Sequence, residues 1–152
     1  MSVKELLIFL VIQLAFVSWS FWEAYMEGDT GWKWNPKWWR INLPRGYTYT
    51  AYHVWAFLIF APIVFIVLPL LIAGFSWRFF WLLLAAVLLG TTLEDFMWFV
   101  VNPSYPLSKW NPSETKWYPW FKLGRLHLPI SYIVKITLAT LILIGPFAIS
   151  QN

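Results

Sequence analysis

The chain has 152 residues, of which 60% are hydrophobic and only 12% are charged. Soluble globular proteins carry about 25% charged residues, so this composition excludes an ordinary water-soluble domain and indicates a protein that folds in lipid. The absence of cysteine excludes disulfides and thiolate metal sites. The net charge of +4 comes from two membrane-flanking loops, so we expect lipid head groups, and no nucleic acid, as the acidic partner.

Four apolar runs reach the length of about 20 residues that a bilayer requires. They cover approximately residues 6–25, 51–73, 79–101 and 129–149. We therefore predict an all-α, polytopic membrane protein, a four-transmembrane-helix bundle that forms one integral membrane domain over residues 1–152. The first run follows Lys4 as a signal peptide would, but no small-residue cleavage site follows it, so we expect a retained anchor.

The helix ends carry recognisable signals. Pro62 and Pro69 remove backbone hydrogen bonds inside the second predicted helix and should bend it. The very short turn at residues 74–78 makes the second and third helices antiparallel neighbours. Pro103 disfavours helical geometry at Asn102 and so ends the third helix. Gly90 is the best candidate for a close approach between helices, together with Ala85 and Ala86.

Two long loops, residues 27–50 and 104–126, are rich in tryptophan and in Lys and Arg. Amphipathic rings beside cations are typical of the head-group layer, so both loops should lie in the membrane interface. Each loop holds four Lys and Arg residues, whereas the remaining ends of the helices hold only Lys4 and Arg78. The positive-inside rule then predicts a multi-pass cell-membrane protein with cytoplasmic long loops and both termini outside.

The connectivity brings most polar residues of the helices to one face of the membrane. This face collects the end of the first helix, the start of the second, the end of the third and the start of the fourth. We expect a polar cavity there, beneath a cap formed by the aromatic loops. Its predicted lining residues are Glu23, His53, Glu94, Asp95, Trp98, Asn102, His127, Ser131 and Lys135.

Glu94 and Asp95 are the strongest candidates for function. A carboxylate near the centre of a bilayer costs roughly 2.5–3.5 kcal/mol on insertion scales, so a chain that keeps two has a partner, a wet cavity or a use for them. The helical rise puts Lys135 about 9 Å inside its helix, level with both acids. An ion pair with one acid is therefore expected if the helices touch, and the alternative is that Lys135 only compensates the acids and locks the bundle.

A metal site is a second interpretation of the same residues. His53, Glu94, Asp95 and His127 are ligand types for iron, manganese or zinc. However, the chain has no His-x-x-His or Glu-x-x-His spacing, and two histidines are few for a di-metal centre. We therefore assign no metal, and the cofactor stays unknown.

The stretch Leu93-Glu94-Asp95-Phe96-Met97-Trp98-Phe99 resembles the Glu-Glu-x-x-Phe-Phe box of the integral-membrane carotenoid (lycopene) cyclases. In that family the acids are thought to protonate the polyene, so the resemblance implies that Glu94 and Asp95 are catalytic acids. The sequence departs from that box at its second acid and at Trp98. Residues 94–103 resemble more closely a Glu-Asp-Phe-x-Trp-Phe-x-x-Asn-Pro box of multi-pass prokaryotic membrane proteins of uncharacterised activity, a resemblance that implies no reaction.

Three functions stay open at this point. The first is binding, with acid-catalysed modification, of a lipid- or isoprenoid-like substrate by an isomerase- or cyclase-like enzyme. The second is a non-catalytic subunit or scaffold of a membrane complex, and the third is a small transporter or channel acting as an oligomer. The expected partners are membrane lipids, a hydrophobic small molecule, and further copies or other membrane subunits. An enzyme or transporter needs a cavity that reaches Glu94, whereas a scaffold needs the polar cluster closed and neutral.

Overall fold

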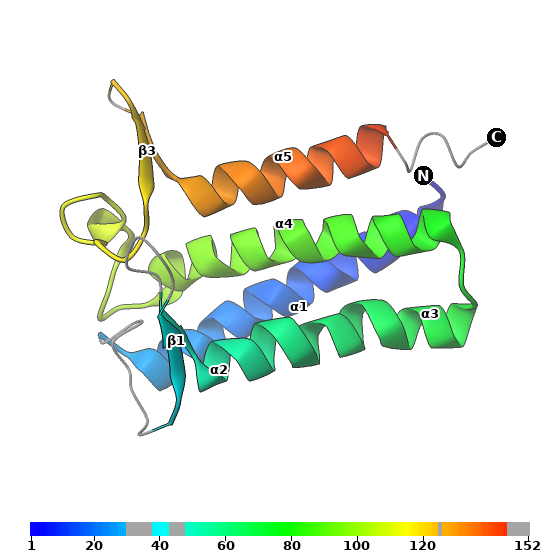
Figure 1. Ribbon diagram of the computed structural model, residues 1–152, viewed down its shortest axis with the longest axis horizontal. Helices are drawn as coiled ribbons and strands as arrows, with labels where there is room; N and C mark the ends of the chain where they lie inside the picture. Colours follow the sequence, from blue (N-terminus) through cyan, green and yellow to red (C-terminus); the bar gives the residue numbers. More distant parts are fainter. Residues whose placement is uncertain (30–37, 43–47, 125, 146–152) are drawn as a thin grey trace.

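The computed structural model describes residues 1–29, 38–42, 48–124 and 126–145. Its helices run side by side, and the strands gather at one end (Figure 1). Helix α1 covers Val3–Glu27, α4 covers Trp77–Val101 and α5 covers Ile130–Ile144. The second long helix, residues 51–73, consists of α2 (Ala51–His53), the π-helical segments η3 (Val54–Phe60) and η4 (Ile63–Val67), and α3 (Leu68–Ala73).

Three helices are long and apolar enough to cross a membrane: α1, the helix from Ala51 to Ala73, and α4. Three of the four predicted spans are thus helices of sufficient length and apolarity. Helix α5 is also apolar but has only 15 residues. It begins at Ile130, and residues 146–149 of the predicted fourth span lie outside the described part of the chain. The fourth crossing therefore stays a prediction.

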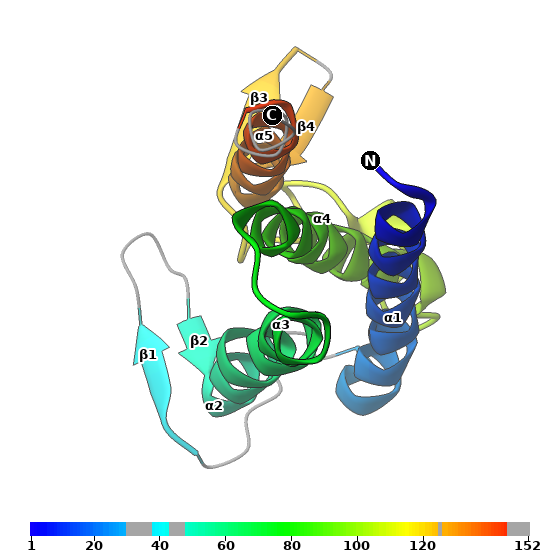
Figure 2. The ribbon, with the colours of Figure 1, turned by 90° about the vertical axis from the view of Figure 1, so that its right-hand side faces the viewer.

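Helix α4 lies between α5 and α3 in the end-on view, with α1 beside it, and contacts α1, α5 and η4 (Figure 2). The predicted close approach at Gly90 is confirmed. An added Cβ at Gly90 would lie 2.6 Å from Cε2 of Phe16, a residue of α1 that is fully buried. Ala85 and Ala86 are fully buried in the same stretch of α4. Small residues thus let α1 and α4 pack closely without a driving force from water.

The prolines of the second long helix coincide with wider helical turns. The backbone N–H of Ala61 donates to the carbonyl oxygen of Ala56, and that of Leu68 to Ile63, which are i to i+5 bonds. Pro62 lies between the two π-helical segments and Pro69 lies in the first turn of α3. Because proline has no N–H to donate, a local change of hydrogen-bond register accommodates it within a continuous helix.

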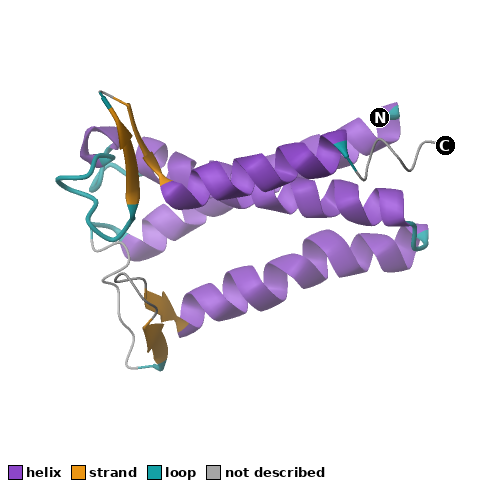
Figure 3. Ribbon diagram, turned by 45° about the horizontal axis from the view of Figure 1, so that its top comes forward, coloured by secondary structure: helices purple, strands orange, loops and turns teal. Residues whose placement is uncertain are grey.

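The two long loops contain antiparallel hairpins, which the all-α prediction missed. Strand β1 (Arg40–Asn42) pairs with β2 (Thr48–Thr50), and β3 (Trp120–Leu123) pairs with β4 (Leu126–Pro129). Both hairpins lie at the end where α1 and α4 finish (Figure 3). Each hairpin leads directly into a helix, β2 into α2 and β4 into α5. The chain therefore repeats the order helix, hairpin, helix.

The opposite end of the molecule is not entirely apolar. There the Arg78 guanidinium donates two hydrogen bonds to the Glu5 carboxylate, at 2.8 and 3.0 Å. Glu5 also belongs to the N-terminal cap of α1, where its carboxylate accepts from the backbone N–H of Ser2. This ion pair joins the starts of α1 and α4 far from the hairpins.

Candidate functional site

A pocket of about 450 Å³ lies at the hairpin end, between α1, the second long helix, α4 and α5. Seven of the nine residues predicted to form a cavity line it, and the wall also includes residues that the sequence did not single out. The lining residues are Glu23, Glu27, Tyr49, His53, Phe57, Leu58, Val87, Leu88, Thr91, Glu94, Asp95, Trp98, Phe99, Trp117, Tyr118, Ser131 and Lys135.

Asn102 does not line the pocket but fixes the end of α4. Its side-chain amide donates to the carbonyl oxygen of Gly28 at 2.6 Å. Its Oδ1 accepts from the backbone N–H groups of Ser104 and Tyr105, at 2.9 and 3.1 Å. Asn102 is 2% exposed, so these bonds satisfy polar groups that water does not reach. The residue therefore joins the ends of α1 and α4.

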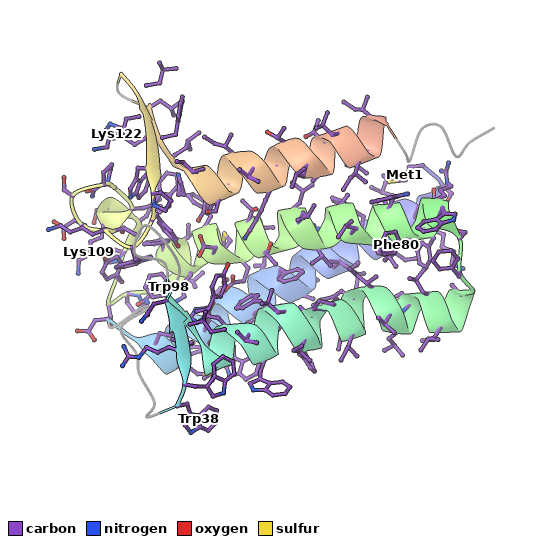
Figure 4. The ribbon with its side chains drawn as sticks, in the orientation of Figure 1. Met1, Trp38, Phe80, Trp98, Lys109 and Lys122 are labelled. Atoms are coloured by element: carbon purple, nitrogen blue, oxygen red, sulfur yellow. The ribbon has the colours of Figure 1, made fainter. Side chains whose placement is uncertain are left out.

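His127 also lies outside the pocket lining. It belongs to β4, opposite Lys122 of β3, at the outer hairpin shown with its Lys122 label in Figure 4. The structure therefore places His127 away from the pocket that Ser131 and Lys135 line. Helix α5 starts only after Pro129, so His127 follows the period of a strand and not that of the helix.

Glu94 is the most deeply buried acid of the pocket, with 3% of its surface exposed. Its carboxyl group interacts with that of Glu23, which reaches it from α1. Its Oε1 atom has no hydrogen-bond partner among the described residues. A buried carboxyl oxygen without a partner costs free energy, so this atom marks a place where a ligand group would be stabilising.

Asp95 has a different environment although it is the next residue. The Tyr118 hydroxyl donates to its Oδ1 at 2.7 Å, and the ammonium group of Lys135 attracts its carboxylate. The expected ion pair between Lys135 and one of the acids does not form. Among the described residues, the ion pair within 4.0 Å is that of Arg78 with Glu5. Lys135 thus acts on Asp95 across the pocket, at longer range.

Tyr118 belongs to an aromatic cluster that closes the hairpin end of the pocket. The buried members of the cluster are Trp98, Phe99, Tyr105 and Tyr118, and Trp98 lies at this end of α4 (Figure 4). Burial, reinforced by the neighbouring Asp95, raises the pKa of Tyr118 well above its ordinary value, so its hydroxyl keeps the proton that it donates.

Two tryptophan side chains of the lining have buried indole N–H groups without a described partner, Trp98 and Trp117. The two indole N–H donors and the Oε1 acceptor of Glu94 all belong to side chains that line this pocket. Such groups usually find a partner when they are buried. The pocket therefore combines an apolar, aromatic wall with polar atoms that have no described partner.

A second polar group lies on the α1 side of the pocket. Glu23, Glu27 and His53 are all buried, and one ligand atom from each lies within 4.8 Å of the others. The ring nitrogen Nδ1 of His53 is 2.7 Å from the Thr50 hydroxyl. Of the four metal candidates predicted from the sequence, only His53 belongs to this group. Glu27 lies four residues after Glu23, a helical spacing that could have identified it.

The pocket is not sealed from the side of the helices. Leu58 of η3 lines it and is 57% exposed, and Ser131 and Lys135 of α5 form the facing wall. Leu58 therefore belongs both to the pocket lining and to the exposed surface of the second long helix.

Comparisons of this chain with protein-family models, with curated proteins and with solved structures gave no match.

Proposed function

We propose that the pocket binds a lipid- or isoprenoid-like molecule taken from the membrane and that Glu94 and Asp95 catalyse its modification by proton transfer. The observation that carries the proposal is a cavity that reaches Glu94 and is lined by both aromatic and carboxyl side chains. Its volume of about 450 Å³ lies within the range of small-molecule sites, roughly 300–1,000 Å³. A scaffold role would instead favour a closed and charge-neutral cluster.

Access from lipid is supported by the position of Leu58. Its side chain is exposed on the helix from Ala51 to Ala73, one of the three helices suited to crossing a membrane, and it also lines the pocket. An apolar chain could pass between this helix and α5 without crossing water. The polar end of the molecule would then meet the carboxyl groups at the hairpin end.

Separate roles for the two acids follow from their surroundings. Glu94 is buried beside another carboxyl group, and we assign it the proton donor. Asp95, held by Tyr118 and attracted by Lys135, is assigned as the acceptor. Protonation of a carbon–carbon double bond would leave a positive carbon, which the faces of Trp98 and Trp117 can stabilise. Loss of a different proton to Asp95 then restores a neutral product, so the reaction is an isomerisation or cyclisation without a co-reactant.

The proposal is tested by native mass spectrometry of the gently extracted protein, followed by identification of any released molecule. We expect wild type to carry a lipid or isoprenoid, and the Glu94→Gln and Asp95→Asn variants to remain folded while they accumulate the unreacted form. Glu114→Gln, which removes an exposed loop carboxylate, is the matched control and should behave as wild type.

Several outcomes would contradict the proposal. An empty protein that is isolated only together with other membrane subunits would favour the scaffold. Loss of folding in both acid variants would indicate that the acids have a structural role. Ion flux through reconstituted oligomers that depends on Glu94, with no bound molecule, would favour the transporter or channel.

A further inference from the structure

We propose that Glu23, Glu27 and His53 bind one divalent transition-metal ion on the α1 side of the pocket. Their ligand atoms lie within 4.8 Å of one another. Carboxylate oxygens and imidazole nitrogens lie about 2.0–2.2 Å from such an ion, so two ligands of one ion are at most about 4.4 Å apart. Small side-chain rotations would close this set around an ion.

The backbone places the three ligands with little freedom. Glu23 and Glu27 are four residues apart near the end of α1, so their side chains lie on the same face of that helix. His53 lies in the first turn of α2, where Thr50 caps the helix. The Thr50 hydroxyl engages Nδ1 of His53 at 2.7 Å, so coordination would use Nε2. A second ring nitrogen held by a hydrogen bond is typical of histidine ligands.

The charges of the pocket favour a bound cation. Its described lining includes four carboxyl groups, those of Glu23, Glu27, Glu94 and Asp95, but only one ammonium group, that of Lys135. The ammonium group of Lys135 attracts the carboxyl groups of Asp95 and Glu94. Buried carboxylates are costly without compensating positive charge, and a divalent ion bound beside Glu23 would supply it.

Glu94 provides an independent observation. Its Oε1 is buried without a described partner, and its carboxyl group interacts with that of Glu23 from the facing helix. Glu94 is outside the three-ligand group, so we assign it to the open side of the ion, where it would accept a hydrogen bond from metal-bound water. A donor set of one imidazole and two carboxylates suits Zn²⁺, Mn²⁺ or Fe²⁺. The inference does not require the proposed lipid chemistry.

The experiment uses the full chain in detergent micelles, stripped with a chelator and dialysed against Mn²⁺. Elemental analysis should give one ion per chain, and pulsed electron paramagnetic resonance should show nitrogen coupling from an imidazole. We expect Glu23→Gln, Glu27→Gln and His53→Ala each to weaken binding by at least about 100-fold, and His53→Ala to abolish the nitrogen coupling. Loss of an outer partner costs less, about 10- to 100-fold, which we expect for Glu94→Gln and Thr50→Val. Thr50→Ser, which keeps the hydroxyl, and Glu114→Gln should bind as wild type.

Substoichiometric metal in wild type, or metal without nitrogen coupling, would overturn the inference even if a ligand variant failed to fold. Unchanged affinity in a folded His53→Ala variant would overturn it as well, because the ion would then lie elsewhere. The two proposals fail separately. A protein with bound metal and no lipid would refute the proposed function alone, and one with lipid and no metal would refute the metal site alone.

Discussion

The hydrogen bond between Tyr118 and Asp95 should hold the aromatic cluster against α4, and the Tyr118→Phe variant tests this. The hydroxyl donates to Oδ1 of Asp95 at 2.7 Å. The ring itself packs at centroid distances of 6.3 Å from Phe99 and 5.9 Å from Trp120. The substitution removes one oxygen atom and preserves these ring contacts, so its effect isolates the hydrogen bond.

The size of the effect depends on the charge of the acceptor. A hydrogen bond to a charged group contributes about 1.5–3 kcal/mol, whereas one between neutral groups contributes about 0.5–1.5 kcal/mol. We expect Tyr118→Phe to lower the free energy of unfolding by about 0.5–3 kcal/mol, because Asp95 would lose the hydrogen bond that Tyr118 donates.

The measurement is reversible unfolding in mixed micelles, arranged as a double-mutant cycle with Asp95→Ala. The coupling free energy between the two sites should equal about 0.5–3 kcal/mol. Tyr25→Phe is the matched control, because Tyr25 is 87% exposed and its hydroxyl should contribute little. A coupling below about 0.5 kcal/mol, the usual error of additivity, would refute the argument that this bond holds the cap in place.

Three further results are expected. Gly90→Ala should destabilise the protein in thermal unfolding, because overpacking against Phe16 costs about 1–3 kcal/mol, whereas the gain in helix propensity is only about 1 kcal/mol. Failure of Phe16→Leu to restore the stability of Gly90→Ala would contradict this packing. Asn102→Ala should lower the free energy of unfolding by about 1–3 kcal/mol and speed hydrogen exchange at the Tyr105 amide, which loses its acceptor; unchanged exchange would count against that cap. Folding raises the pKa of Tyr118 above its ordinary 10.0. The contribution of protonated Tyr118 to the free energy of unfolding is therefore complete below pH 10 and decreases above it. Wild type should then lose up to about 1.4 kcal/mol per pH unit more than Tyr118→Phe, and parallel pH curves would exclude this linkage.

The sequence predicts the long apolar helices and the polar end of this protein, because the length of an apolar run can be counted directly along the chain. Three of the four predicted spans are helices of sufficient length. The short connection at residues 74–76 forces α3 and α4 to be antiparallel, so the polar helix ends must meet at one face. Glu23, His53, Glu94, Asp95 and Lys135 consequently line one pocket.

The hairpins were not predicted because a hairpin is stabilised by cross-strand partners and not by the composition of its loop. Trp120 and Phe121 are strand-forming residues and Gly124 is a turn residue, yet the density of tryptophan and lysine indicated only an interfacial loop. For the same reason the sequence did not show that His127 belongs to a strand. It also concealed Tyr118, whose contact with Asp95 depends on how the loop folds back over α4.

The sequence by itself determined how deep each polar side chain lies along its helix, because the rise per residue is fixed. Only the tertiary structure decided how the helices are rotated and how far apart they lie, since these follow from packing such as that of Gly90 against Phe16. Those rotations divide the acids into two groups, Asp95 with Tyr118 and Lys135 on one side, and Glu23 with Glu27 and His53 on the other. Residues at one level can therefore belong to different sites, and the distances between helices, not the spacing along the chain, assign each acid its partner.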